Sequence, residues 1–215
     1  MPHNIVLKKY RIYMEEIIER QEVCVRVVNA LKDQEYITGS VKADIDVLYL
    51  QIRKMFELMM FASISAHTLT EKLSNKLQKA WNAEDILRTI ERINPDFFPK
   101  PYLLQKNIAS SGKEKEFNTH RIIQTKDTFG TSFLTKEEMK KFYTRDCNDF
   151  SHAKRENKYG NLFDQNYHMI KTREVLTKWV ALLRNHSVNL GDAILVVDMF
   201  NYEGNVQVIY AVVEI

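Results

Sequence analysis

The sequence predicts a mainly α-helical bundle that ends in a β-hairpin. Apolar residues recur at helical spacing in several long segments between residues 4 and 185. The end of the chain instead holds two runs rich in β-branched and aromatic residues, 193–200 and 206–215, joined by the turn sequence NYEGN. We therefore expect one domain, with a helical bundle over residues 1–186 and a hairpin over 187–215 packed on it.

The first half of the chain is expected to form two long helices. The first covers residues 4–31, and the second covers 41–65, with Ser40 at its N-cap position. Apolar residues of the second segment follow the i, i+3, i+4, i+7 pattern of one buried helix face. These residues are Ile45, Leu48, Tyr49, Ile52, Met55, Phe56 and Met59. The last turns, LMMFASIS, are apolar all round, so we expect this end to be buried on several sides.

Further helices are expected over residues 69–79, 83–93 and 164–185. Between them, the segment NPDFFPKPY holds three prolines and must be extended or turned, because proline interrupts helices. We expect this segment to lay Phe97 and Phe98 over the core as a strap.

The middle of the chain is more polar. Residues 105–117 indicate an exposed loop, and 118–124 are ambiguous between a loop and a short strand. Thr135 and Glu138 then match the S/T-x-x-E capping box that starts many helices. We therefore expect a helix over residues 136–153.

Charge is unevenly distributed along the chain. The net charge is +3, which is too small to predict nucleic-acid binding by itself. From Ser187 onward there are four acidic residues and no Lys or Arg, so the preceding part carries +7. A polyanion is therefore expected to bind away from the C-terminal segment.

The two cysteines, Cys24 and Cys147, lie far apart and form no metal-ligand spacing. We therefore expect no metal site and no cofactor, and a reduced, cytoplasmic setting. The sequence shows no apolar segment of signal-peptide type and none long enough to span a membrane. It also lacks the glycine loops of the common nucleotide hydrolases and the nucleophile elbow of many hydrolases.

The stretch over residues 143–160, YTRDCNDFSHAKRENKYG, concentrates the candidate functional residues. Arg145 and His152 are seven positions apart, which on an α-helix is a rotation of ~700° and a rise of ~10.5 Å. Asn148 and Asp149 lie between them at helical offsets of three and four. The spacing thus predicts that an arginine, a histidine, an amide and a carboxylate share one helix face.

Two interpretations of this stretch stay open. In the first, Arg145 pairs with Asp149 across one turn, and His152 caps the last carbonyls of the helix. In the second, His152 performs acid–base chemistry while Arg145 holds an anion, because a histidine titrates near neutrality and a guanidinium matches a phosphate. Lys154 and Arg155 either extend that anion site or form a solvated loop.

The stretch TRDCNDFSH resembles the R-x4-6-H motif of HEPN domains, with Arg145 followed by the polar Asp146 and closed by His152. The second predicted helix, which includes YLQIRKMFELMMFASISAH, resembles the helix that pairs with the motif in those domains. The resemblance covers roughly residues 41–185, and the C-terminal hairpin lies outside the common HEPN core.

This resemblance implies a helical bundle that is usually dimeric. Many members are metal-independent ribonucleases of toxin or defence systems, and others bind RNA, a nucleotide or a protein without catalysis. The motif assigns catalysis to Arg145 and His152. We place four further residues at the substrate: Asp146, Asn148, Lys154 and Arg155. The implied partners are RNA, a second copy of the chain, and an antitoxin or another protein.

A third hypothesis needs no nucleic acid: a helical interaction domain whose hairpin edge adds a strand to a partner. The surroundings of Arg145 discriminate between the hypotheses. If Arg145 and His152 are both exposed in a basic groove, the ribonuclease and the binding module stay open, whereas Arg145 buried against Asp149 favours the interaction domain.

Overall fold

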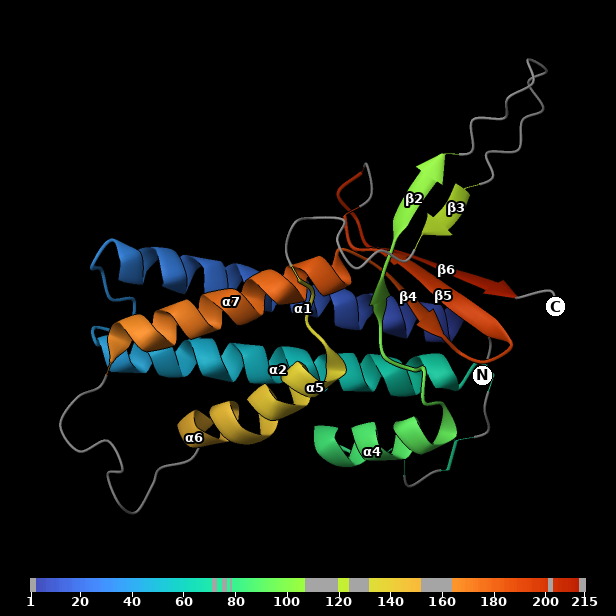
Figure 1. Cartoon of the computed structure of the whole chain (residues 1–215), viewed down its shortest axis with the longest axis horizontal. Helices are drawn as coiled ribbons and strands as arrows, with labels where there is room; N and C mark the ends of the chain where they lie inside the picture. The colour runs from blue at the N-terminus through green and yellow to red at the C-terminus, as the bar shows by residue number, and fades with distance from the viewer. Residues whose placement is uncertain are drawn as a thin grey trace.

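The computed structural model shows a mainly helical protein with a small antiparallel sheet (Figure 1). It describes residues 3–70, 73–74, 77, 79–106, 120–123, 132–151, 164–200 and 203–212. The helices are α1 (His3–Lys32), α2 (Val41–His67), α4 (Ala83–Ile93), α5 (Lys136–Lys141), η1 (Phe142–Cys147), α6 (Asn148–Ser151) and α7 (Gln165–Leu183). The strands are β1 (Lys100–Pro101), β2 (Leu103–Lys106), β3 (His120–Ile123), β4 (Asn185–Asn189), β5 (Ala193–Asp198) and β6 (Gln207–Val212). The helix expected over 69–79 and the loop expected over 105–117 lie largely outside the described residues.

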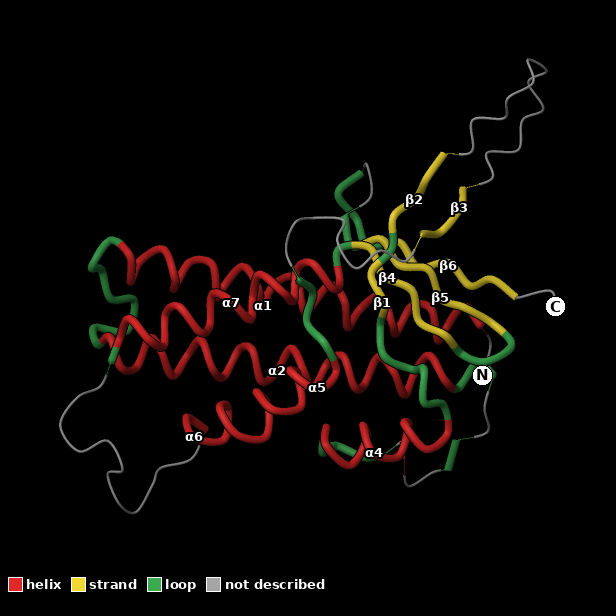
Figure 2. The backbone as a smooth tube through the Cα atoms, viewed as in Figure 1, coloured by secondary structure: helices red, strands yellow, loops and turns green. Residues whose placement is uncertain are grey.

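Helix α2 runs through the centre of the bundle. Figure 2 shows α1 and α7 on one side of it and α4, α5 and α6 on the other, and α2 contacts α1, α4, α6, α7 and η1 directly. Residues 58–67 are buried at every position except Phe61, which is half-buried. The expectation that this apolar end is covered on several sides is confirmed.

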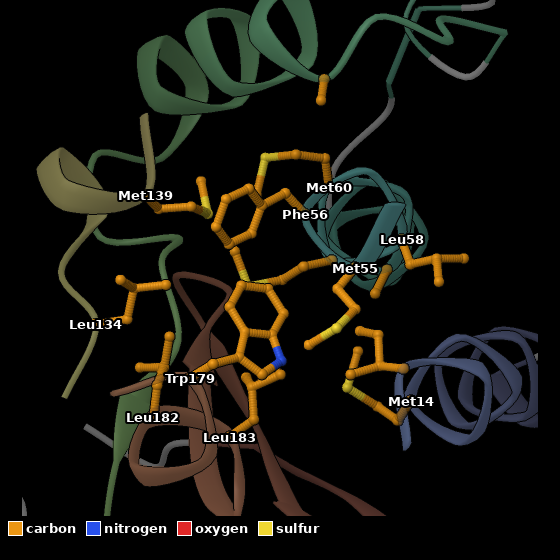
Figure 3. Packing of buried hydrophobic residues seen from close by; sticks show 14 of the residues in the cluster. Met14, Met55, Phe56, Leu58, Met60, Leu134, Met139, Trp179, Leu182 and Leu183 are labelled. Carbon is orange, nitrogen blue, oxygen red and sulfur yellow. The ribbon is translucent and has the colours of Figure 1, made fainter. Parts of the chain in front are cut away.

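The centre of the core is the pair Phe56 and Trp179, whose ring centroids are 4.8 Å apart. Four methionines from three helices surround the two rings in Figure 3. They are Met14 of α1, Met55 and Met60 of α2, and Met139 of α5. The indole N–H of Trp179 is buried without a hydrogen-bond partner in the described part of the chain, which costs roughly 1–3 kcal/mol. Burial of the large indole ring offsets that cost. Because Met14, Phe56, Met139 and Trp179 pack together, α1, α2, α5 and α7 share one core.

The C-terminal hairpin belongs to a four-stranded sheet, which corrects the expectation of two strands. Strands β5 and β6 pair antiparallel as predicted, and the full order is β1-β4-β5-β6. Helix α7 ends at Leu183, two residues before the expected end at residue 185. Residues 185–189 form strand β4 instead. The β4 sequence NHSVN holds one β-branched residue, and local pattern therefore gives no strand signal. Pairing with β5 on one side and β1 on the other makes it a strand.

The proline-rich strap is confirmed. Phe97 is fully buried and Phe98 packs at the margin of the core. The strap continues into β1, at the edge of the sheet, where Pro101 is tolerated because an edge position does not require its N–H. The ambiguous segment 118–124 contains strand β3, which pairs with β2 in a separate two-stranded ladder.

A buried hydrogen bond joins α1 to the sheet. The Tyr10 hydroxyl lies 2.9 Å from Nε2 of His186, and Nδ1 of the same ring lies 2.8 Å from the carbonyl oxygen of Leu183. Because a carbonyl only accepts, Nδ1 carries the proton and Nε2 accepts from the Tyr10 hydroxyl. Burial lowers the pKa of His186 to about 4 and raises the pKa of Tyr10. The His186 ring is therefore neutral in the folded protein near pH 7.

We expect the free energy of unfolding to fall as the pH is lowered from about 6.5 to about 4. The ordinary histidine pKa is 6.5, whereas folded His186 stays neutral down to about 4. In this window the unfolded chain binds more protons, so acid favours unfolding, and above it the contribution of His186 is fully present. Burial also lowers the pKa of His168, which acts in the same direction. Urea denaturation at several pH values measures the slope.

The control is a histidine at an exposed position. His186→Gln should reduce the pH slope, while His3→Gln, at an exposed position of α1, should leave it unchanged. A His186→Gln protein with the wild-type slope would show that the buried ring does not titrate as described.

Candidate functional site

The helix that carries Arg145 is wound as a π-helix in its middle. Thr135 and Glu138 form the predicted capping box at its start. Helix α5 then leads directly into η1, a π-helix, and η1 into α6. The expected regular α-helix over 136–153 is thus wrong over Phe142–Cys147, where hydrogen bonds join residues five apart instead of four. Such segments are rare and frequently coincide with functional sites.

The π-helix changes which residues share a face. Asn148 donates from Nδ2 to the carbonyl oxygen of Thr144 at 2.8 Å, and its Oδ1 accepts a hydrogen bond from Arg53 of α2. Arg145 instead lines a hollow between η1 and α7. The expectation that Arg145 and Asn148 lie on one face is therefore wrong, because it assumed the rotation per residue of an α-helix.

A polar network holds η1 against α2. Nε of Arg53 lies 3.2 Å from Oε1 of Glu57, and the Tyr143 hydroxyl donates to the same carboxylate oxygen at 3.1 Å. The Arg53 guanidinium also lies over the Tyr143 ring, 4.8 Å from its centroid. Burial, together with the Glu57 carboxylate, raises the pKa of Tyr143 to about 12. Arg53, Glu57 and Tyr143 thus each have a partner in this partly buried network.

A stack of three aromatic rings fixes the same segment at two further points. Tyr49 of α2 lies between Phe142 and Phe150, with centroid distances of 5.5 and 4.0 Å and ring planes within 6° of parallel. The Tyr49 hydroxyl lies 3.1 Å from Nδ1 of His168 on α7. Because Phe142 begins η1 and Phe150 lies in α6, the stack holds both ends of the π-helix on α2.

Arg145 is the exposed cation of this segment. Its side chain is 70% exposed, and its contact with a carboxylate is a long one, 4.0 Å from Nε to Oδ1 of Asp146. That Oδ1 accepts a hydrogen bond from Lys171 at 2.6 Å, and Asp146 is only 13% exposed. Burial alone would lower the pKa of Lys171, but its hydrogen bonds to Asp146 and Tyr167 outweigh burial and raise it. Lys171 thus neutralises Asp146, and the Arg145 guanidinium faces solvent.

The hollow beside Arg145 has a volume of about 370 Å³ and mixed charge. We call it the Arg145 hollow. Its cations are Lys141, Arg145, Lys171 and Lys178, and its carboxylates are Glu138, Asp146 and Glu174. Lys178 lies within 2.9 Å of both glutamates, and Lys171 pairs with Asp146. In the described part of the chain, this leaves Lys141 and Arg145 without a carboxylate closer than 4.0 Å.

The structure brings together part of the predicted site. Arg145 and Asp146 lie side by side at the hollow, whereas Asn148 is bonded to α2. His152, Lys154 and Arg155 lie outside the described residues. Sequence reasoning missed the α7 residues Tyr167, Lys171, Glu174 and Lys178. Their spacing is a visible helical stripe, but only tertiary structure pairs that stripe with η1.

No metal centre is found within the ranges that the structure describes: no group of three or more His, Cys, Asp or Glu side chains there is placed to hold an ion. Cys24 and Cys147 are both buried free thiols. Among the same residues, no helix combines the length and the apolar character that crossing a bilayer requires.

Comparison of the chain with protein-family models, with curated proteins and with solved structures finds no match. The resemblance to HEPN domains therefore stays a prediction that rests on the sequence motif.

We expect Tyr143→Phe to lower the free energy of unfolding by about 1 kcal/mol, the usual net contribution of a hydrogen bond. The substitution removes the hydroxyl between Arg53 and Glu57 and keeps the ring. Tyr36→Phe, at an exposed tyrosine, should change stability by less than about 0.5 kcal/mol. Urea denaturation compares the two variants, and equal small losses would mean that the network does not stabilise the docking of η1 on α2.

Proposed function

We propose that this protein is a HEPN-like ribonuclease that cleaves RNA without a metal ion. In this proposal Arg145 holds the phosphate and His152 transfers the proton. The assignment of His152, the dimer and a setting in a toxin or defence system follow from the motif resemblance.

The observation that carries the proposal is the state of Arg145. Its guanidinium is 70% exposed, and the nearby Asp146 carboxylate is already hydrogen-bonded to Lys171. Among the described side chains, which do not include Asp149, no carboxylate lies closer than 4.0 Å to the Arg145 guanidinium. A planar guanidinium in this state is well suited to bind a phosphate through two parallel hydrogen bonds.

Exposure of Arg145 is one part of the condition under which the sequence favours the ribonuclease or the binding module over a pure interaction domain. The other parts are a basic groove and an exposed His152; the hollow beside Arg145 has mixed charge, and His152 lies outside the described residues.

The chemistry follows from RNA itself. The 2′-hydroxyl of RNA attacks the adjacent phosphate once a base removes its proton, and the leaving 5′-oxygen then takes up a proton. A histidine serves either proton transfer, because its pKa lies near neutrality. Arg145 stabilises the negative charge that builds on the phosphoryl oxygens, a preorganised contribution worth about 3 kcal/mol. A second copy of the chain would bring a second Arg145 and His152 to the site.

A second candidate function is a HEPN-like module that binds RNA, a nucleotide or a protein without cleavage. One observation favours it: the Arg145 hollow holds three carboxylates beside its four cations. Paired charges of this kind weaken the positive field that draws a polyanion into a cleft. Binding through Arg145 alone is compatible with this arrangement.

We expect the purified protein to cleave single-stranded RNA in the presence of EDTA and to leave 2′,3′-cyclic phosphate ends. DNA of the same sequence should stay intact, because it lacks the attacking 2′-hydroxyl. His152→Ala should lower the cleavage rate by about 100-fold or more, the usual scale for the loss of an acid–base group. Arg145→Ala should have an effect of similar size. Product analysis on denaturing gels and by mass spectrometry measures these outcomes.

Arg173→Ala is the matched control, because Arg173 is an exposed arginine of α7 that does not line the Arg145 hollow. It should cleave at the wild-type rate. If the His152 and Arg145 variants fold normally and still cleave like wild type, the proposed site is wrong. A wild-type protein that binds RNA but never cuts it would replace the ribonuclease by the binding module.

A further inference from the structure

An exposed tryptophan just before α4 lies near exposed arginines of that helix. Trp81 precedes the N-cap residue Asn82 and is 79% exposed. The chain has two tryptophans, and the other, Trp179, is 1% exposed. A large aromatic ring left in water loses the stabilisation that burial would give it, roughly 2 kcal/mol or more. Folding stability therefore does not explain the position of Trp81.

The arginines follow Trp81 along one helix stripe. Asp85, Arg88 and Arg92 are exposed and stand at helical offsets of three and four, so they share a face. At ~1.5 Å per residue, the two arginines start ~6 Å apart along the axis. Together with Trp81 and Lys79 they line a hollow of about 840 Å³. We call it the Trp81 hollow.

The described lining of the Trp81 hollow has an excess of positive charge. Among the described residues, it includes the cations Lys79, Arg88 and Arg92 and one carboxylate, Asp85. Arg88 is hydrogen-bonded to Glu84 at 2.9 Å and lies 4.0 Å from Asp85. Within the described residues, Arg92 and Lys79 form no ion pair, so two cations are available to an anionic ligand.

We propose that the Trp81 hollow binds single-stranded RNA, with one base stacked on Trp81 and the following phosphates held by Arg88 and Arg92. An aromatic platform beside a row of cations is the arrangement by which proteins bind single strands without reading their sequence. Trp and Arg are also enriched in protein–protein interfaces, but Lys is depleted there, and the Trp81 hollow includes Lys79. The charge of +7 on the chain before Ser187 also favours the binding of a polyanion such as RNA.

This site goes beyond the proposed ribonuclease and does not depend on it. Its residues belong to α4 and the segment before it, whereas the Arg145 hollow is lined by α5, η1 and α7 and by Leu134. Either surface can therefore bind RNA when the other fails.

The test uses the tryptophan itself as the probe. Titration of the full chain with a short oligouridine at low salt should quench the emission of Trp81, because a stacked base contacts the ring. Trp81→Phe, which retains only the buried Trp179, should show no such change. Inorganic polyphosphate, which carries charge but no base, should leave wild-type emission unaltered. In fluorescence polarisation with labelled oligouridine, Trp81→Ala should weaken binding by about 5- to 100-fold.

The arginines are tested by the salt dependence of the same binding. Arg88→Gln and Arg92→Gln should each reduce the slope of log affinity against log salt concentration by about 0.7, the value for one phosphate contact on a single strand. Arg26→Gln, at an exposed position of α1, and Tyr36→Ala, at an exposed aromatic residue, are matched controls that should bind like wild type.

Oligouridine that binds without changing Trp81 emission, or a Trp81→Ala protein with wild-type affinity, would overturn the inference. If no oligonucleotide quenches Trp81 but a protein partner does so, the surface belongs to a protein and the inference is wrong. The Arg145→Ala variant separates the two proposals. Oligouridine should still quench Trp81 emission in this variant. If the protein fails to cleave RNA, the proposal for the Trp81 hollow is unaffected, and if Trp81 is not quenched, the ribonuclease proposal is unaffected.

Discussion

The burial of α2 is the constraint on which the other elements depend. Residues 58–67 offer almost no polar face, so this end is stable only when α1, α4 and α7 cover it. The middle of α2 is different, because Arg53 and Glu57 place charge where η1 packs. Glu57 accepts a hydrogen bond from Tyr143, and Arg53 donates one to Asn148. Tyr49 stacks between the rings of Phe142 in η1 and Phe150 in α6. One central helix therefore determines both the core and the position of the Arg145 segment.

The consequence for the site is that Arg145 is turned toward α7 and not toward α2. In the π-helix, Asn148 is bonded to α2 while Arg145 and Asp146 line the Arg145 hollow. Nζ of Lys171 forms an ion pair with the Asp146 carboxylate at 2.6 Å. Nε of Arg145 lies 4.0 Å from the same carboxylate oxygen. Among the described side chains, which do not include Asp149, the carboxylate nearest to Arg145 is that of Asp146. Its pairing with Lys171 of α7 therefore leaves Arg145 available to a phosphate.

Much of the fold was predictable where one local signal dominates. The bounds of α1, α2 and α4 follow from periodicity, and the capping box at Thr135 follows from cap chemistry. Ser40 occupies the expected N-cap position of α2, but its side chain makes no capping hydrogen bond. Strand β4 was not predictable, because NHSVN becomes a strand only by pairing with β1 and β5. The π-helix was also not predictable from local pattern, because it accompanies tertiary contacts of Tyr143 and Asn148 with α2. Of the residues that line the Arg145 hollow, the sequence analysis named Arg145 and Asp146, whereas the place of Lys171 depends on the packing of α7.

The most direct test of this account is the RNA affinity of variants that alter the pairing of Asp146. Lys171→Gln and Lys141→Gln each remove one positive charge from the Arg145 hollow, but only the first frees the Asp146 carboxylate to pair with Arg145. Lys171→Gln should therefore weaken binding more, by about a further fivefold, and Asp146→Asn should restore more affinity in that variant than in Lys141→Gln. Equal losses and equal recoveries would contradict the claim that Lys171 keeps Arg145 available to RNA.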